Sequence, residues 1–261
     1  MRSIIRVALA TLLLLPAGLR AQSLDEVRQA GMAAREARDA RGAAERFQGA
    51  LALDSMDYVS NWALALSLID LGKVTPDSVS STERDSLYAL AEVHAHRAVA
   101  ARPEDAEGHF VLAVAIGRAA LTKSKKERVR RAVEIRKEAL ETIRLDSLHD
   151  GGYHVLGRWN AEVMRLSSLQ RFFAKAFLGG GALGRASWDE AIGSMEKSVA
   201  LNPRRIYHRL DLARIYVDRH RYADARAQLE QIAALPLLDH GDESYQAEAA
   251  ALLEQIRGRG D

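Results

Sequence analysis

The feature that most constrains this chain is a repeat of 34 residues in its C-terminal part. The segments WDEAIGSMEKSVALNP, from Trp188, and YADARAQLEQIAALP, from Tyr222, share one pattern. Each has an alanine three residues after its aromatic residue, and a large apolar residue four positions further on. Ala191 and Ala225 are therefore 34 residues apart. A period of this length is typical of stacked helical hairpins, in which small residues let two helices approach closely. The repeat predicts an all-α fold.

Weaker copies of the pattern extend the array towards the N-terminus. The first helix of each expected hairpin carries a small packing residue, and these are Gly31, Ala65, Ala113, Gly157 and Ala213. We expect five helix pairs and a closing helix, at about 24–55, 58–103, 106–147, 150–203, 206–237 and 243–257. This arrangement is a right-handed α-solenoid of tetratricopeptide-like hairpins. Because each hairpin of such an array contacts only its neighbours, we expect the chain to unfold first at its less regular N-terminal end.

Three of the expected pairs are longer than the period, with extra residues at about 73–86, 120–130 and 162–185. The first insertion has the composition of a polar loop. In the last one, apolar residues recur at helical spacing, and these are Leu169, Phe172, Phe173, Ala176 and Phe177. They predict an extra helix that packs against the body of the repeats. Ser187 and Glu190 have the spacing of a capping box at the start of the next helix.

The first residues have the order of a secretory signal peptide. Arg2 and Arg6 precede an apolar run that is too short to span a bilayer as a mature helix, and Pro16 follows it. We expect cleavage after Ala21, which leaves one domain over residues 22–258 in the periplasm or outside the cell. Loss of the three leader arginines would change the formal charge from +2 to −1. The basic isoelectric point therefore does not indicate nucleic-acid binding.

The second half of the chain resembles a known family. YHVLGRW, SLQRFFAKAFLGGG, ASWDEAI, a closing LNP and LARIY resemble the regulator-of-microtubule-dynamics family of tetratricopeptide proteins and its shorter, exported bacterial relatives. The resemblance covers about residues 132–256. It implies an all-helical binding domain without catalytic activity, related to animal proteins that associate with microtubules or act at organelle contacts. The chain departs from those relatives in its leader, in lacking a mitochondrial anchor, and in residues 181–184, where many members have a proline.

Motifs that could carry chemistry are weak. Residues 179–184, GGGALG, fit the letters of a dinucleotide-binding loop, but the preceding segment is helical in period rather than a strand. His94 and His96 would point to opposite sides of a helix, and His149, Asp150 and His154 lack a further ligand in register. The chain has no cysteine, and no serine sits in a strand-turn-helix elbow. We therefore expect no catalytic residue, no metal site and no cofactor.

A dense basic stretch, KSKKERVRR, spans residues 123–131. Lys123, Lys126 and Arg130 would line one helical face, which is either solvated surface or a site for acidic phospholipid or an acidic partner. The leader and the lack of interleaved aromatic residues disfavour nucleic acid as the partner. No stable membrane span is expected after the leader is removed.

The remaining candidate site is the concave groove that the first helices of the hairpins would line. The residues that we expect to bind there are Arg35, Trp62, Phe110, Arg118, His154, Arg158, Tyr207 and Arg214. Arginines alternate with aromatic residues, so the surface would suit a carboxylate-bearing peptide. The function expected is a non-enzymatic binding or scaffold module for a protein or peptide partner. The alternative is a carrier or sensor of a lipid-like amphipathic molecule, held in the groove or in a pocket beneath the helix at 172–177.

The segment Gly157-Arg158-Trp159 combines three separate roles in this interpretation. Gly157 would let two helices cross closely, and Trp159 would turn away from the groove and pack between neighbouring hairpins. Arg158 would either bind the partner or form an intramolecular ion pair with Glu162.

Overall fold

The computed structural model describes residues 23–76, 78–177 and 181–260, so the expected signal peptide lies outside the described residues. Within the described residues the chain forms α-helices and two short 3-10 helices, with no strand. The helices are α1 Leu24–Glu36, α2 Ala40–Leu53, α3 Tyr58–Lys73, α4 Thr82–Ala101, α5 Ala106–Ala119, η1 Ala120–Thr122, α6 Lys125–Leu145, α7 Asp150–Arg165, α8 Ser168–Phe177, η2 Gly181–Arg185, α9 Trp188–Leu201, α10 Ile206–Asp218, α11 Tyr222–Ile232 and α12 Asp242–Gln255. None of these helices is long and apolar enough to cross a membrane.

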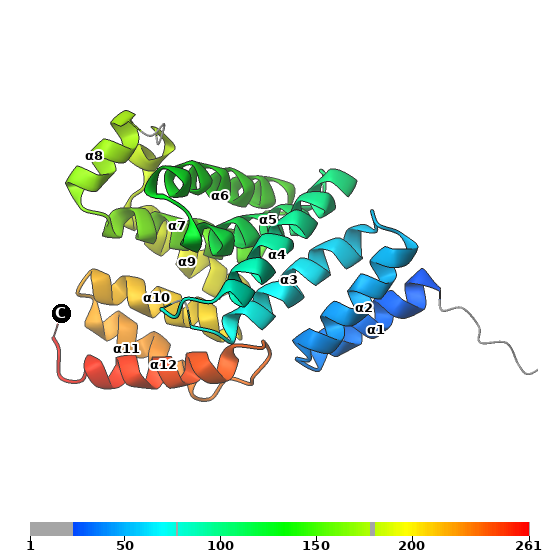
Figure 1. Cartoon of the computed structure of the whole chain (residues 1–261). Coiled ribbons are helices and arrows are strands. Elements are labelled where there is room, and N and C mark those ends of the chain that lie inside the picture. Colours follow the sequence, from blue (N-terminus) through cyan, green and yellow to red (C-terminus); the bar gives the residue numbers. More distant parts are fainter. Residues whose placement is uncertain (1–22, 77, 178–180, 261) are drawn as a thin grey trace, which may run out of the picture.

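The helices pair into hairpins in chain order, and the expected α-solenoid is confirmed (Figure 1). α1 packs on α2, α3 on α4, α5 on α6 and α10 on α11, whereas α7 packs on α9. α8 and η2 are inserted between the two helices of that fourth hairpin. α12 packs on α10 and α11 and closes the array.

Side-chain caps begin most of these helices. Ser23, Asp57, Ser81 and Ser124 each accept a hydrogen bond from a backbone N–H of the first helical turn, which would otherwise have no partner. The sequence places a serine or aspartate just before these helical periods, so these starting points follow from local chemistry, whereas α10, α11 and α12 begin without a side-chain cap.

The expected capping box at α9 is half right. Ser187 Oγ accepts the Glu190 N–H at 3.0 Å, but the Ser187 N–H donates to the Asn160 side chain at 3.2 Å. The Glu190 carboxylate lies 3.8 Å from Arg136 instead. The hydrogen bond between the Glu190 side chain and the Ser187 N–H, which would complete the capping box, is therefore replaced by contacts with Asn160 and Arg136. These two residues are distant in sequence, so the local spacing could not predict them.

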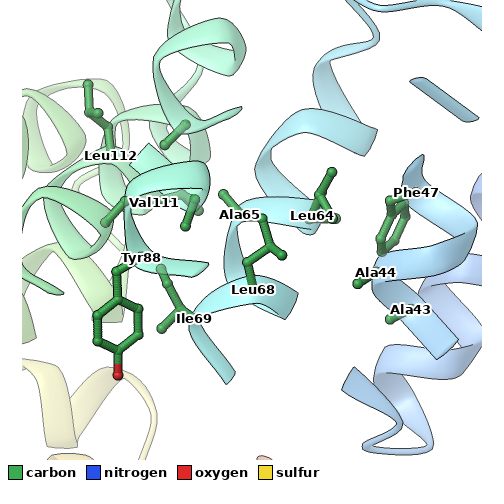
Figure 2. Packing of buried hydrophobic residues seen from close by; sticks show 14 of the residues in the cluster. Ala43, Ala44, Phe47, Leu64, Ala65, Leu68, Ile69, Tyr88, Val111 and Leu112 are labelled. Atoms are coloured by element: carbon green, nitrogen blue, oxygen red, sulfur yellow. The ribbon is translucent and has the colours of Figure 1, made fainter. Parts of the chain in front are cut away.

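Buried apolar residues form two main cores. The first joins α1 to α5 around Phe47, Leu64 and Tyr88, with alanines at the closest helix contacts (Figure 2). The second joins α7 to α9, α10, α11 and α12. The contact of α5 with α6 includes a buried polar pair, because His109 Nδ1 and Glu138 Oε2 are 2.5 Å apart.

Gly157 lies where α7 crosses α9, as expected. A Cβ atom there would be 3.0 Å from both the Ala191 carbonyl oxygen and the Met195 nitrogen, and neither backbone atom can move alone. We predict that Gly157→Ala lowers the free energy of unfolding by about 1–3 kcal/mol, despite the better helix propensity of alanine. Gly193→Ala is the matched control, because this glycine is exposed within α9 and its Cβ would meet nothing within 4 Å. There alanine should stabilise by about 0.5–1 kcal/mol in urea unfolding. Equal effects at both sites would contradict the close crossing.

The ends of the solenoid contact each other, so the expectation that hairpins touch only their neighbours is wrong. His240 Nδ1 lies 3.3 Å from the carbonyl oxygen of Arg38, 202 residues away in the chain, and Arg38 lies 3.7 Å from Glu243. The blue turn between α1 and α2 and the segment before α12 are therefore adjacent (Figure 1). The curvature of the solenoid accumulates over five hairpins and brings its two ends together. The expectation considered only contacts between consecutive hairpins and so left this curvature out.

The inserted helix α8 is present, but its expected packing against the repeats is wrong for three of the five residues, because Leu169, Phe172 and Ala176 are exposed. Leu169 and Phe172 are 64% and 59% exposed. The side chains of Phe173 and Phe177 lie outside the described ones. α8 packs mainly on η2, whose Leu183 is buried against Trp159. Helical spacing identifies an apolar face, but it does not show what covers that face.

Candidate binding cleft

A cleft of about 330 Å³ opens in the second half of the chain, between α7, α10 and α12. α7 and α10 contribute residues three or four apart, which share one helical face, and α9 and α12 contribute one residue each. The lining residues are Arg158, Ala161, Glu162, Arg165, Met195, Asp211, Arg214, Ile215, Val217, Asp218 and Leu252. The cleft combines an apolar floor with charged walls, and its volume is at the lower end of the range for small-molecule sites.

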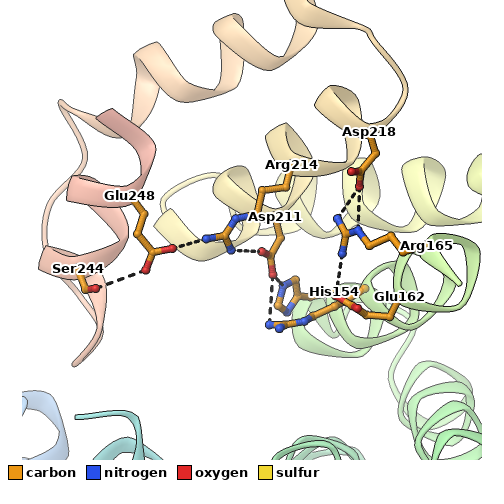
Figure 3. Close-up of polar contacts among 9 residues, drawn as sticks. His154, Glu162, Arg165, Asp211, Arg214, Asp218, Ser244 and Glu248 are labelled. Carbon is orange, nitrogen blue, oxygen red and sulfur yellow. Dashed lines mark hydrogen bonds and ion pairs between the residues drawn. The ribbon is translucent and has the colours of Figure 1, made fainter. Parts of the chain in front are cut away.

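The carboxylate of Asp211 is the shared acceptor at the centre of the cleft (Figure 3). His154 Nε2 lies 2.9 Å from Asp211 Oδ2, Arg214 donates to Oδ1 at 2.7 Å, and Arg158 lies 3.6 Å from Oδ2. Burial by itself would raise the pKa of this carboxyl group. The Arg158 guanidinium, His154 and Arg214 outweigh that effect and hold the pKa of Asp211 well below its usual range. The carboxylate therefore stays charged.

Further ion pairs continue the walls of the cleft. Arg214 also pairs with Glu248 of α12, which accepts a bond from Ser244. Arg165, at the end of α7, bonds Asp218 at 2.6 Å and Glu162 at 2.7 Å (Figure 3). These contacts join α7 to α10 and α10 to α12, so charged side chains fix the positions of all three helices.

Two histidines and a tyrosine lie beside the acidic centre. The ring of His154 is 4.9 Å from the rings of both Tyr207 and His208. His208 is fully buried, and within the described residues neither of its ring nitrogens makes a hydrogen bond of ordinary geometry. Burial, with His154 and Arg205 nearby, lowers the pKa of His208 to about 2. This imidazole is therefore neutral in the folded protein.

We predict that His208 weakens the fold in mild acid. An unfolded histidine takes up a proton below pH about 6.5, but the folded one does not, so stability is lost as the pH falls from there towards 2. The loss at pH 5 should be about 2 kcal/mol relative to neutral pH. Urea unfolding of the wild type and His208→Asn at pH 7 and pH 5 measures it, because the variant lacks this titration. The same pH dependence in both proteins would contradict the burial of a neutral imidazole.

The expected groove residues fall into two groups. Arg158 and Arg214 line the cleft, His154 is buried beneath Asp211, and Tyr207 packs edge-on against His154. Arg35, Trp62, Phe110 and Arg118 lie on α1, α3 and α5, away from the cleft. Because these four residues do not line the cleft, a role for them in binding stays a prediction.

Each residue of that second group has structural contacts. Arg35 donates to Ser67 Oγ at 3.3 Å. Trp62 packs against the first core. Phe110 covers Gly151, where a Cβ would be 2.5 Å from the ring. Arg118 lies near Lys73, where burial and this guanidinium lower the pKa of the amine but Asp70 outweighs them and raises it.

Sequence reasoning missed most of the partners that define the cleft. Asp211 is four residues after Tyr207 and so shares its helical face, a signal that makes it one of several candidate positions without selecting it. Glu248 and Leu252 were missed because α12 was expected only to close the array. Arg165 lies at the end of α7, where it reaches Asp218 on the next hairpin.

In the segment from Gly157 to Asn160, Trp159 packs in the interior and Arg158 lies at the cleft. Trp159 is 5% exposed and packs with Val163 and Leu183, and its indole N–H donates to the Ala132 carbonyl at 2.7 Å. The expectation that it packs between hairpins is confirmed. Arg158 is 48% exposed and pairs with Asp211, whereas Glu162, the partner considered from sequence, bonds Arg165.

The histidines have separate partners. His94 is buried against Asn61, and His96 is half exposed near Glu92, so the two point in different directions as expected. His149 lies 3.2 Å from Glu107, whereas His154 lies 2.9 Å from Asp211. In the described part of the chain, no three acidic or histidine side chains are grouped so that they could hold a metal ion.

Comparisons with known proteins agree with this architecture. The model of the family described as "Regulator of microtubule dynamics protein 1-3" matches residues 24–257, which extends the resemblance to the N-terminal hairpins. TTC0263, a tetratricopeptide protein of Thermus thermophilus, is 19% identical and aligns over 88% of this chain and 100% of its own, with a TM-score of 0.60. PilF of Pseudomonas aeruginosa is 15% identical over 91% and 93%, with a TM-score of 0.53. These two structures establish the fold alone. No curated protein matches the chain.

Proposed function

This chain belongs to the regulator of microtubule dynamics protein 1-3 family, and we propose that it is a non-enzymatic scaffold whose cleft holds a carboxylate-bearing segment of a protein partner. The observation that carries the proposal is the arrangement around Asp211. Two arginines from different helices, Arg158 and Arg214, already hold a carboxylate there. The carboxylate of an Asp or Glu of the partner would pair with the same arginines.

Arg158 is the anchor that we assign to the partner. Its side chain is 48% exposed at the cleft, and a guanidinium has five N–H donors in a fork that matches a carboxylate. The floor beneath it is apolar, with Ala161, Met195 and Ile215. An extended segment could place an apolar side chain on this floor while its carboxylate pairs with Arg158.

The cleft favours binding over catalysis. The residues that line it include no serine, threonine, tyrosine or cysteine that could act as a nucleophile. Its carboxylates form ion pairs with arginines, an arrangement that suits charge recognition. The leader expected from the sequence supports the further proposal that the partner is met outside the cytoplasm.

We predict that Arg158→Ala leaves the fold nearly intact but weakens the binding of acidic peptides about tenfold or more. A half-exposed ion pair contributes only about 0–1 kcal/mol to stability, whereas a charged hydrogen bond to a bound carboxylate contributes about 1.5–3 kcal/mol. Peptides enriched on the wild-type protein from a random phage-displayed library provide the ligands, and fluorescence anisotropy measures their affinity.

Arg41→Ala is the matched control, because Arg41 is an exposed arginine on α2. It should bind the selected peptides as the wild type does. Enriched peptides without acidic residues, or equal affinity for Arg158→Ala, would contradict the proposal. Unfolding of Arg158→Ala would instead place the arginine in a structural network.

A lipid-like amphipathic ligand is the second candidate, because the same cleft joins an apolar floor to an arginine wall. Native mass spectrometry of the purified protein distinguishes the two. Co-purifying lipid that is lost in Arg158→Ala would favour the carrier. A protein without bound lipid that selects acidic peptides would favour the scaffold.

A further inference from the structure

The inserted helix α8 lies at one edge of the molecule (Figure 1), and it carries exposed apolar side chains. Leu166, just before α8, is 36% exposed, and Leu169 and Phe172, three residues apart on one helical face, are 64% and 59% exposed. We call these three residues the α8 face. Single exposed apolar residues are common on protein surfaces, but adjacent ones on one helix mark a contact surface.

Basic residues outnumber acidic ones along the α8 segment. The sequence from Val163 to Trp188 contains no aspartate or glutamate, and its charged residues are Arg165, Arg171, Lys175 and Arg185. Arg165 is paired with Glu162 and Asp218, so the other three supply the positive charge of this segment. A segment that combines Leu and Phe with Lys and Arg is typical of helices that lie in a membrane interface.

The neighbouring surface adds to this charge. α8 packs on η2, and Leu183 of η2 packs near Val129 and Ala132 in the first half of α6. The basic stretch found in the sequence covers the turn before α6 and its first two helical turns, and its exposed members are Lys123, Lys126, Arg128 and Arg130. Arg130 is paired with Glu127, and Arg131 with Glu92 and Glu127, whereas Arg128 bonds backbone carbonyls and keeps its charge. Lys123, Lys126 and Arg128 therefore add positive charge to this surface.

We propose that the α8 face docks on the surface of a bilayer that contains anionic lipids. The apolar side chains would enter the boundary between head groups and acyl chains, and Lys123 and Lys126 would lie near the lipid phosphates. This contact is peripheral and does not involve the cleft, so it stands independently of the proposed function. A protein partner with an acidic rim is the competing occupant, and the test separates the two.

The absence of cysteine from the chain allows a local test. Leu169→Cys and Leu53→Cys, each labelled with a dye that shifts to the blue in apolar surroundings, report on two sites of similar exposure. Leu53 is 58% exposed and lies at the end of α2. The whole protein is mixed with vesicles of phosphatidylcholine and phosphatidylglycerol in equal parts, or of phosphatidylcholine alone.

We expect a blue shift for the dye at position 169 with the mixed vesicles, and little shift with phosphatidylcholine alone. The dye at position 53 should not shift with either. No shift at position 169, or an equal shift at position 53, overturns the proposal, and the first of these leaves a protein partner as the occupant.

Charge reversal tests the electrostatic part. Lys126→Glu should weaken binding to the mixed vesicles about tenfold or more, since each basic residue near an anionic surface contributes about 1 kcal/mol and reversal doubles the change. Arg41→Glu, on exposed surface of α2, should have a much smaller effect. Equal effects of the two variants would overturn the assignment of this face to the membrane.

Discussion

Trp159→Ala should lower the free energy of unfolding by about 3–5 kcal/mol, the range expected when a large buried aromatic side chain is removed. The indole fills the space between α6, α7 and η2, packs against Val163 and Leu183, and lies 5.4 Å from the Arg136 guanidinium. Its N–H is bonded to the Ala132 carbonyl, which would lose that partner. Urea unfolding followed by circular dichroism measures the change.

Trp159→Phe separates the two contributions of this side chain. Phenylalanine keeps most of the apolar volume but leaves the Ala132 carbonyl without its donor, so a loss of about 1–3 kcal/mol is expected. Trp62→Ala is a second control, because Trp62 is only partly buried against the first core. If Trp159→Ala lowers the free energy of unfolding no more than Trp62→Ala does, the packing of Trp159 between the hairpins is less tight than in the structure.

Trp159 also illustrates what the sequence could predict. Apolar and aromatic residues on a helical period usually face another helix, so the hairpins, their order and the closing helix could be predicted from spacing. Gly157 followed in the same way, because a glycine at the position of the small packing residue indicates close helix contact. Local rules of this kind require no knowledge of distant residues.

The cleft could be predicted only in part, because it depends on contacts between residues far apart in the chain. Arg158 and Arg214 were identified from their helical face. Asp211, which pairs with both, was not, because one helical face offers several candidate positions and no rule selects among them. The exposure of Leu169 and Phe172 was missed for a related reason. An apolar face predicts burial unless the chain has nothing nearby to cover it.

Asp211→Asn should destabilise the protein and strengthen its binding of acidic peptides. The neutral amide cannot balance the charges that surround Asp211, and His154, which is buried, loses its carboxylate acceptor. Removal of one partner from a buried pair costs about 3–5 kcal/mol, but Arg158 and Arg214 are 48% and 37% exposed and can turn to solvent. We therefore expect a loss of about 2–3 kcal/mol at neutral pH.

The pH dependence of that loss has a definite sign. The folded pKa of Asp211 is depressed, so its contribution to stability is present above the unfolded value of about 3.9 and disappears as the pH falls below it. The difference in unfolding free energy between the wild type and Asp211→Asn should therefore shrink as the pH falls below about 4. A difference that stays constant into strong acid would contradict a charged Asp211.

Peptide affinity provides the independent readout. In the wild type, the Asp211 carboxylate competes with a bound carboxylate for Arg158 and Arg214, and the amide of Asp211→Asn competes far less. The acidic peptides selected on the wild type should bind this variant several-fold more tightly. Asp218→Asn, which removes a carboxylate bonded to Arg165 at the end of α10, should have a smaller effect. Weaker binding by Asp211→Asn would contradict this competition. It would mean that the Asp211 carboxylate orients Arg158 and Arg214 for the peptide and is itself a part of the binding site.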